Sequence, residues 1–270
     1  MPSADFCLAM MPYQAVEHPS LAMGLLVAAA KEAGFSAFGT YPAMRFASAI
    51  GLKAYGYLAD QYLSQLGEWS FSKAAFPDFT PDDREYFALI EGHVAARGKK
   101  LLLGLDELRV VRDAAVSFVK SEAARIVGGG VRILGCGAQF QQQCASLALL
   151  REVKAIDPGV ITVLGGVCYS GAPGRIARES FPWVDVVFSG EADSAIGGLI
   201  KLLLEHGPAI PREKLPSGVI AASGYQPDSL GEPLYALADD INAIPIPDHD
   251  DFFRERKEFK ELTSNPAFLA

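Results

Sequence analysis

The sequence predicts an α/β protein built on a doubly wound parallel sheet of about five strands. Short apolar runs alternate with helical segments from Val131 onward, which is typical of parallel strands joined by crossover helices. A β-α-β pattern also opens the chain. The residues between these two regions have helical spacing only, so they predict a helical insertion between the second and third strands.

The first strand is predicted over residues 5–11, which are mostly apolar and end at Pro12. A helix follows from Ser20, which can cap it, to Gly34, which can close it. The second strand is predicted over residues 35–41. Residues 43–130 form the expected insertion together with one crossover helix, and within them Thr80 as cap and Pro81 at the first position predict a helix start.

Alternation then resumes, with strands predicted at 131–136, 160–164 and 184–189 and helices at 141–156, 174–180 and 192–206. Residues 218–223 are expected to add an edge strand. This order is that of a Rossmann-like or flavodoxin-like sheet spanning residues 1–224. Proline and aspartate dominate from Tyr225 on, as in "IPIPDHDDFF", and predict a linker over residues 225–270.

Composition excludes several classes of protein. The net charge of −8 and the lack of a basic cluster argue against a nucleic-acid partner. No apolar run reaches the about 18 residues of a membrane span, and the N-terminus lacks the positive region of a secretory signal. The four cysteines are scattered, without disulfide or zinc spacing, so a reducing cytoplasm is expected.

In an open parallel sheet, ligands bind beyond the carboxyl ends of the strands. The segments that follow the predicted strands are "PYQAVEHPS", "GAQFQQQ", "GGVCYSG" and "SGEAD", and we expect them to meet at one edge. The first strand is not followed by G-x-G-x-x-G and no Walker A sequence exists, which argues against NAD, FAD and ATP. Flavin mononucleotide stays open. The glycine pair Gly165–Gly166 suits either a long, bulky ligand lying along the backbone or a tight turn.

Five segments in this order, "MPYQAVEHPSLAMGLL", "FQQQCASLAL", "VLGGVCYSG", "FSGEAD" and "DDINAIPIPDHDDFF", resemble the N-terminal part of cobalamin-dependent radical SAM proteins. The resemblance is closest to the methyltransferases that mature ribosomally made peptides (RiPPs), and it covers nearly the whole chain. It implies a cobalamin cofactor and a peptide substrate. In that family S-adenosylmethionine and a [4Fe–4S] cluster belong to a following domain with a C-x-x-x-C-x-x-C motif, which this sequence lacks. We therefore expect the cobalamin-binding part alone, with the linker leading toward the missing domain.

The resemblance implies a set of cofactor-binding residues in these loops and no catalytic or metal-ligating residue. The set is Pro12, Tyr13, Ser20, Gln139, Phe140, Gln141, Gln142, Gly165, Gly166, Val167, Ser189, Gly190 and Glu191. Alternatives remain open for several of them. The glutamines could bind the amides of the corrin ring or only begin a helix, and Ser189 or Glu191 could contact the ligand or cap the next helix.

The cobalt is expected to have no histidine beneath it, which is the base-off mode without a protein ligand. Methionine-synthase-like proteins place the ligating histidine in D-x-H-x-x-G, but Val16 and Leu21 occupy the flanking positions around His18 here. We therefore interpret His18 as a surface residue. The acids at 248–251 are interpreted as a solvated linker turn rather than a metal site, and the cysteines Cys136, Cys144 and Cys168 as small hydrophobic residues. Other functions that fit are a stand-alone cobalamin carrier or sensor and a flavin-binding domain.

Overall fold

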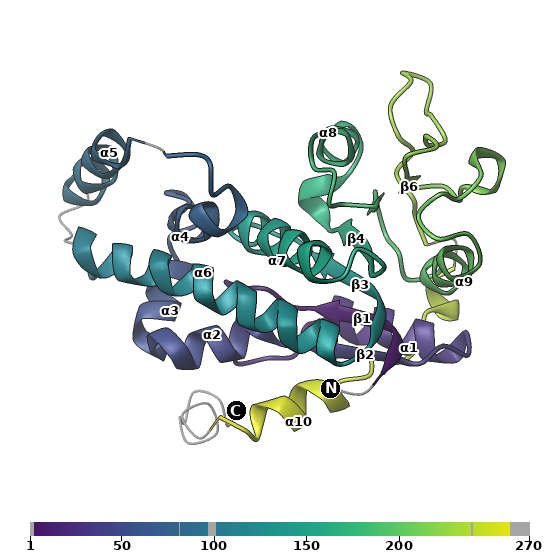
Figure 1. Cartoon of the computed structure of the whole chain (residues 1–270), viewed down its shortest axis with the longest axis horizontal. Coiled ribbons are helices and arrows are strands. Elements are labelled where there is room, and N and C mark those ends of the chain that lie inside the picture. Colours follow the sequence, from purple (N-terminus) through teal and green to yellow (C-terminus); the bar gives the residue numbers. More distant parts are fainter. Residues whose placement is uncertain (1–2, 81, 97–100, 239, 260–270) are drawn as a thin grey trace.

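The computed structural model describes residues 3–80, 82–96, 101–238 and 240–259. It contains one six-stranded sheet in the order β2-β1-β3-β4-β5-β6 (Figure 1). The strands β1 (Ala4–Ala9), β2 (Ala37–Thr40), β3 (Val131–Gly137), β4 (Ile161–Gly165) and β5 (Val186–Phe188) are parallel, and β6 (Val219–Ile220) is antiparallel to β5. The predicted doubly wound sheet is confirmed, with β6 as the expected edge strand.

The order of the strands reverses between β1 and β3. The chain moves from β1 outward to β2, then returns past β1 and continues to β3, β4 and β5. Right-handed crossovers that run in opposite directions place their helices on opposite faces of the sheet. The carboxyl ends of β1 and β3 therefore flank the switch point at which ligands bind in open α/β sheets.

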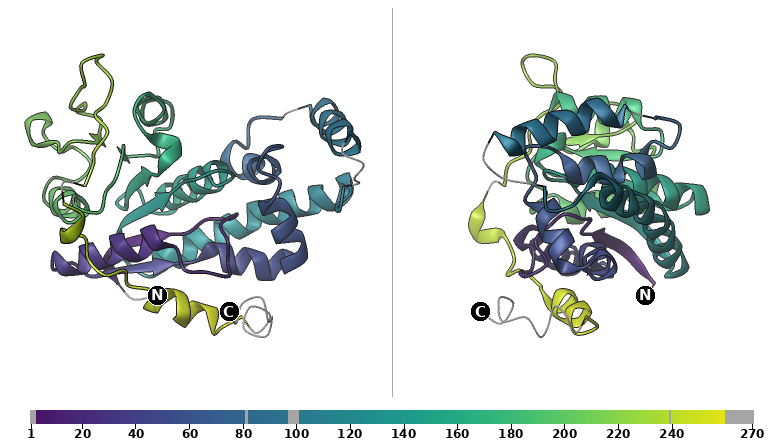
Figure 2. Two further views of the ribbon diagram at one scale, coloured as in Figure 1. Left: turned by 180° about the vertical axis from the view of Figure 1, so that it is seen from behind. Right: turned by 90° about the vertical axis from the view of Figure 1, so that its left-hand side faces the viewer.

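Helices cover both faces of the sheet (Figure 2). One face is covered by α1 (Leu21–Glu32) and α9 (Ile196–His206), which pack against each other. The other face is covered by α6 (Leu105–Gly128), α7 (Gln143–Ile156) and α8 (Ala172–Ser180). As expected, Ser20 caps α1 by accepting a hydrogen bond from the Met23 N–H, and Gly34 follows its end with a φ of 90°. Short 3₁₀ helices occur at Val167–Tyr169, Arg212–Lys214 and Ile241–Ala243.

The insertion between β2 and β3 consists of α2 (Pro42–Ile50), α3 (Leu52–Ala59), α4 (Leu66–Ala75), α5 (Asp83–Ala95) and the long α6. The start of α5 differs from the prediction. Its cap is Asp82, whose carboxylate accepts from the Arg84 N–H, rather than Thr80, and Pro81 lies outside the described residues. Aspartate and threonine are both good caps, so composition alone did not fix the first turn.

The prediction of a linker fails for residues 250–256. They form a helix, α10 (Asp250–Arg256), that packs along the edge strand β2. Phe252 is 1% exposed, and its ring meets the Tyr41 ring edge to face. The two acids Asp251 and Glu255 are buried against the strand, although acids in a Pro-rich segment are typical of a solvated turn.

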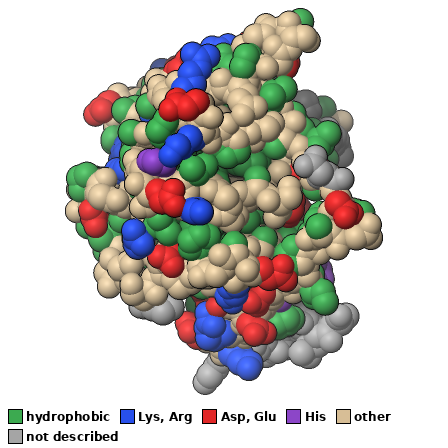
Figure 3. All heavy atoms as spheres, turned by 90° about the vertical axis from the view of Figure 1, so that its right-hand side faces the viewer, with side chains coloured by type: hydrophobic (Ala, Val, Ile, Leu, Met, Phe, Trp, Pro, Cys, Tyr) green, Lys and Arg blue, Asp and Glu red, His purple; other side chains and the backbone are tan. Residues whose placement is uncertain are grey.

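No helix of the described residues is long and apolar enough to cross a membrane. The face over α9 and the loops of residues 207–240 carries acidic and basic side chains intermingled, without a broad basic patch (Figure 3).

Candidate functional site

A cavity of about 300 Å³ lies between the sheet and helices α1 and α9, at the carboxyl ends of the strands. All four loops that follow the parallel strands β1, β3, β4 and β5 contribute to it. They supply Gln14 and Ser20, Gln139 and Gln142, Gly165 to Val167, and Gly190 to Asp193. The structure therefore confirms that these loops meet at one edge, next to the switch point between β1 and β3.

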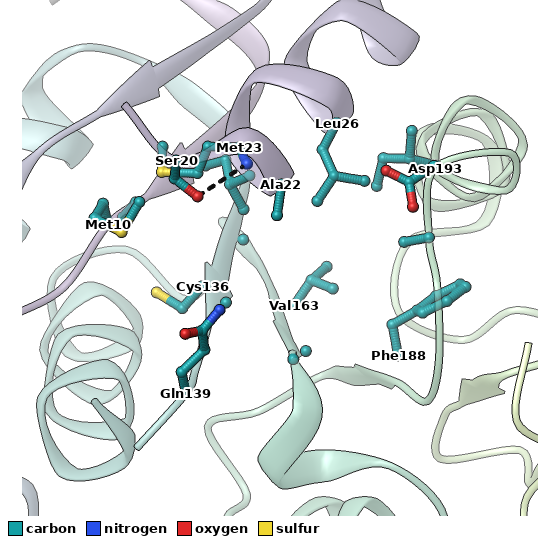
Figure 4. Close-up of a pocket in the computed structure, with 18 of the residues that line it drawn as sticks. Met10, Ser20, Ala22, Met23, Leu26, Cys136, Gln139, Val163, Phe188 and Asp193 are labelled. Atoms are coloured by element: carbon teal, nitrogen blue, oxygen red, sulfur yellow. Dashed lines mark hydrogen bonds between the residues drawn. The ribbon is translucent and has the colours of Figure 1, made fainter. Parts of the chain in front are cut away.

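The inner wall of the cavity is apolar (Figure 4). Leu8, Gly135 and Val163 are aligned across β1, β3 and β4, so their positions face the same side of the sheet. Leu26 and Ala22 of α1 point into the cavity opposite Val163. The side chains that complete this wall are Phe6, Met23, Phe188, Ile196 and Leu199, all nearly fully buried.

Glycine keeps the outer end of this wall open. Gly137 and Gly165 are paired in the register of β3 and β4, and both line the cavity. A side chain at Gly137 would meet no atom within 4 Å, and one at Gly165 would make ordinary contact with Phe188 at 3.6 Å. The protein's own packing would tolerate a side chain at either position. The absence of these two side chains therefore serves to leave room in the cavity.

Gly166 has a different explanation. Its φ is 101°, a region that favours glycine, and a β-carbon there would overlap the backbone of Ala138. The tight turn that the sequence left open is therefore present at Gly166, whether or not a ligand binds. The same holds for Gly190, which has a φ of 111° and where a β-carbon would overlap the backbone of Ala236.

Polar side chains lie at the mouth of the cavity. Ser20 is at the start of α1, Gln139 follows β3, and Asp193 precedes α9 beside Leu26 and Phe188. Burial raises the pKa of Asp193, and the nearby charge of Glu191 adds to the rise. Burial also raises the pKa of the Cys136 thiol well above its usual range, so this thiol stays neutral in the wall. The mouth can therefore offer hydrogen bonds from a carboxyl, an amide and a hydroxyl.

Several predicted residues serve the protein's own structure instead. Tyr13 is buried and its hydroxyl lies 2.7 Å from the Ser70 hydroxyl, inside the helical insertion. The Gln141 amide accepts from the Gly67 N–H and donates to the carbonyls of residues 58 and 59. Pro12 is buried outside the cavity, next to Tyr13 in the chain. Tyr13 and Gln141 thus connect the insertion to the loops after β1 and β3.

Gln142 lines the cavity, but its amide is engaged: it donates to the Met11 carbonyl and accepts from the Gln139 N–H. Within the described residues no hydrogen bond engages the side chain of Gln139. Phe140 is 67% exposed beside the cavity loops and does not line the cavity. Of the four neighbours, Gln139 is thus the one with an amide available to a ligand.

The alternative that Ser189 or Glu191 caps α9 is wrong. Helix α9 begins after Ala195, without a side-chain cap. The buried Ser189 hydroxyl accepts from the Gly171 N–H, and Glu191 accepts from the Ala238 N–H. These bonds tie the loops after β4 and β5 to each other and to the segment that follows β6.

The histidines, acids and cysteines of the described ranges were compared as possible metal ligands. Among the residues that the structure describes, no three His, Cys, Asp or Glu side chains are arranged to hold a metal ion. His18 is exposed in the loop after β1 and does not line the cavity. Cys7 and Cys136 are buried and Cys144 and Cys168 half-buried, and all four are free thiols.

The sequence did not reveal Gly137, Asp193 or the walls from α1 and α9. Gly137 lies in "GCGAQF", and its pairing with Gly165 becomes visible only with the β3–β4 register. The apolar residues of α1 are too evenly distributed around the helix to show which side faces a ligand. Comparison with protein-family models and with curated proteins found no match to this chain.

Proposed function

We propose that the cavity binds cobalamin, with the nucleotide tail inside and the corrin ring at the mouth. The observation that carries this proposal is one apolar cavity, lined by all four loops at the switch point and open where Gly137 and Gly165 lack side chains. Its volume of about 300 Å³ lies at the lower end of ligand sites. A group of nucleotide size fits such a volume, whereas the ring would have to remain outside.

The surroundings of the mouth suit a large ring with amide side chains. Phe140 and Val167 are each 67% exposed in the loops after β3 and β4, and they offer apolar surface beside the opening. Gln139 adds an amide that the described residues leave without a partner. A cobalt without a histidine beneath it remains part of the proposal, because His18 lacks the flanking residues of the D-x-H-x-x-G pattern.

We further propose that the chain is the cofactor-binding part of a cobalamin-dependent radical SAM methyltransferase that acts on a peptide. This step depends on the resemblance of the loop sequences. In that family bound cobalamin carries a methyl group to the substrate. The residues described above would hold the nucleotide tail in the cavity, keep water from the apolar wall and orient the ring toward a neighbouring domain.

The proposal can be tested with a substitution that fills part of the cavity. Gly137→Leu places a side chain in open space that belongs to the cavity, and it should weaken hydroxocobalamin binding at least about tenfold. Gly198→Leu is the control, because Gly198 also has open space around it but lies on α9 away from the cavity. Equilibrium dialysis with absorbance detection measures both variants, with flavin mononucleotide in parallel. Unchanged cobalamin binding by Gly137→Leu, or binding of the flavin alone, would overturn the proposal.

A further inference from the structure

We infer that the inner cavity selects the lower base of the cofactor and favours a benzimidazole over a purine. This inference rests on the proposed cobalamin site and adds to it the chemical class of the base. Cobamides differ from one another in that base, so the cavity that receives the nucleotide tail is where they can be distinguished.

The inner wall presents only carbon and sulfur from its side chains. Its members come from both covering helices and from three strands: Phe6, Leu8, Met23, Leu26, Val163, Phe188, Ile196 and Leu199. The backbone groups behind them are engaged in the parallel sheet or in helices α1 and α9. A polar atom that enters this part of the cavity therefore loses water and finds no side-chain partner among the described residues.

The polar side chains lie at the mouth instead. Asp193 and Ser20 are half-buried, while Gln139 and Glu191 are exposed. They follow the ends of the strands or begin a helix, so they can reach the ribose and the ring amides of a ligand that enters tail first. Gln142 is buried, but its amide is already bonded to Met11 and Gln139.

The two bases differ in how many polar atoms they would bring to this wall. Dimethylbenzimidazole has one ring nitrogen free once it is joined to ribose, together with two methyl groups. Adenine joined in the same way has three free ring nitrogens and an amino group. Buried polar groups without partners are disfavoured, whereas methyl groups gain from burial. We therefore expect the adenine cobamide to bind at least about tenfold more weakly.

The experiment compares dicyano forms, because cyanide on both faces of the cobalt keeps either base uncoordinated. Equilibrium dialysis of the full chain gives dissociation constants for the dimethylbenzimidazole cobamide, the adenine cobamide and cobinamide, which lacks the nucleotide. The expected order of affinity is dimethylbenzimidazole, then adenine. Equal affinity of the two complete cobamides overturns the base preference and leaves the proposed function standing. Failure of every cobamide to bind refutes the proposed function itself.

Two variants test whether the wall is the cause. Leu26→Gln adds an amide to the cavity, and Val163→Thr adds a hydroxyl with nearly the same shape; each should reduce the preference several-fold. Leu202→Gln is the matched control, since Leu202 is also a half-buried helical leucine but lies outside the cavity. Circular dichroism establishes that each variant is folded. A preference that survives both cavity variants unchanged overturns the assignment to this wall.

Discussion

Replacement of Asp251 should show how strongly α10 is held on the sheet. The Asp251 carboxylate accepts a hydrogen bond of 2.7 Å from the Gly39 N–H, and Glu255 accepts one of 3.0 Å from the Tyr41 N–H. Four residues of helix rise about 6 Å, and two residues of strand span about 6.6 Å. One turn of α10 therefore matches two N–H groups, that of Gly39 in β2 and that of Tyr41 just after it, along an edge strand whose outer side no other strand of the described residues covers.

The expected loss can be worked out from burial. Asp251 is 5% exposed, and its truncation leaves a buried N–H of Gly39 without an acceptor. Such a group costs about 1–3 kcal/mol of unfolding free energy. The contact of Asp251 with Arg254 adds little, because the arginine side chain is 60% exposed. For a chain of this size each kcal/mol lowers the melting temperature by about 2–4 °C, so Asp251→Ala should lower it by about 2–12 °C.

Thermal unfolding followed by circular dichroism measures this effect. Asp250→Ala is the control, because Asp250 is exposed in the same first turn of α10 and shares only the favourable charge near the helix start. Asp251→Asn should fall between the two, since its carbonyl can still accept from Gly39. If Asp251→Ala and Asp250→Ala lower the melting temperature equally, the carboxylate is not what holds the helix on the strand.

Three further predictions concern the turn, the charge network and the histidine. Gly166→Ala should lower the free energy of unfolding in urea by about 1–3 kcal/mol, because its β-carbon would overlap the Ala138 backbone; an unchanged value would contradict this. Burial raises the pKa of Glu122, but the hydrogen bonds and charges of Arg45 and Arg125 together outweigh it and hold that pKa below the ordinary 4.5. Glu122→Gln should therefore be less stable at neutral pH, with a difference that shrinks as the pH falls below 4.5; a difference independent of pH would refute the argument. In the cob(II)alamin-loaded protein, electron paramagnetic resonance should show no three-line nitrogen splitting, and His18→Ala should leave the spectrum unchanged; a splitting lost in that variant would identify His18 as a ligand.

The positions of the strands along the chain were predictable because a buried parallel strand is a short, continuous apolar run. Residues 160–164 illustrate this: the run predicts the strand, and the structure places β4 at Ile161–Gly165. The meeting of the four loops followed from the same pattern, because parallel strands end at one edge. Side-chain roles did not follow, since an amide such as that of Gln141 can bond a ligand or a neighbouring helix with equal ease.

The C-terminal helix could not be predicted because its partners are backbone groups. Asp251 and Glu255 lie in a segment rich in proline and acids, which is typical of solvated turns. The carboxylates of these two residues accept hydrogen bonds from backbone N–H groups at the outer edge of β2. Those N–H groups are unpaired only because β2 is the edge strand of the sheet. Strand order is a property of the whole fold, so no local window of sequence contains it.

Helix α1 connects this C-terminal segment to the cavity. Residues 22 and 26 lie on nearly the same side of the helix, and residue 24 lies on the opposite side, because successive residues are turned by about 100°. Ala22 and Leu26 line the cavity, whereas Gly24 faces the segment before α10: its carbonyl accepts from the Asp248 N–H, and a β-carbon there would overlap His249. Lys31, farther along α1, pairs with Asp248 at 2.6 Å. The segment that leads into α10 therefore supports the back of the helix whose front forms a wall of the cavity, so the position of this wall depends on how α10 is fastened to β2.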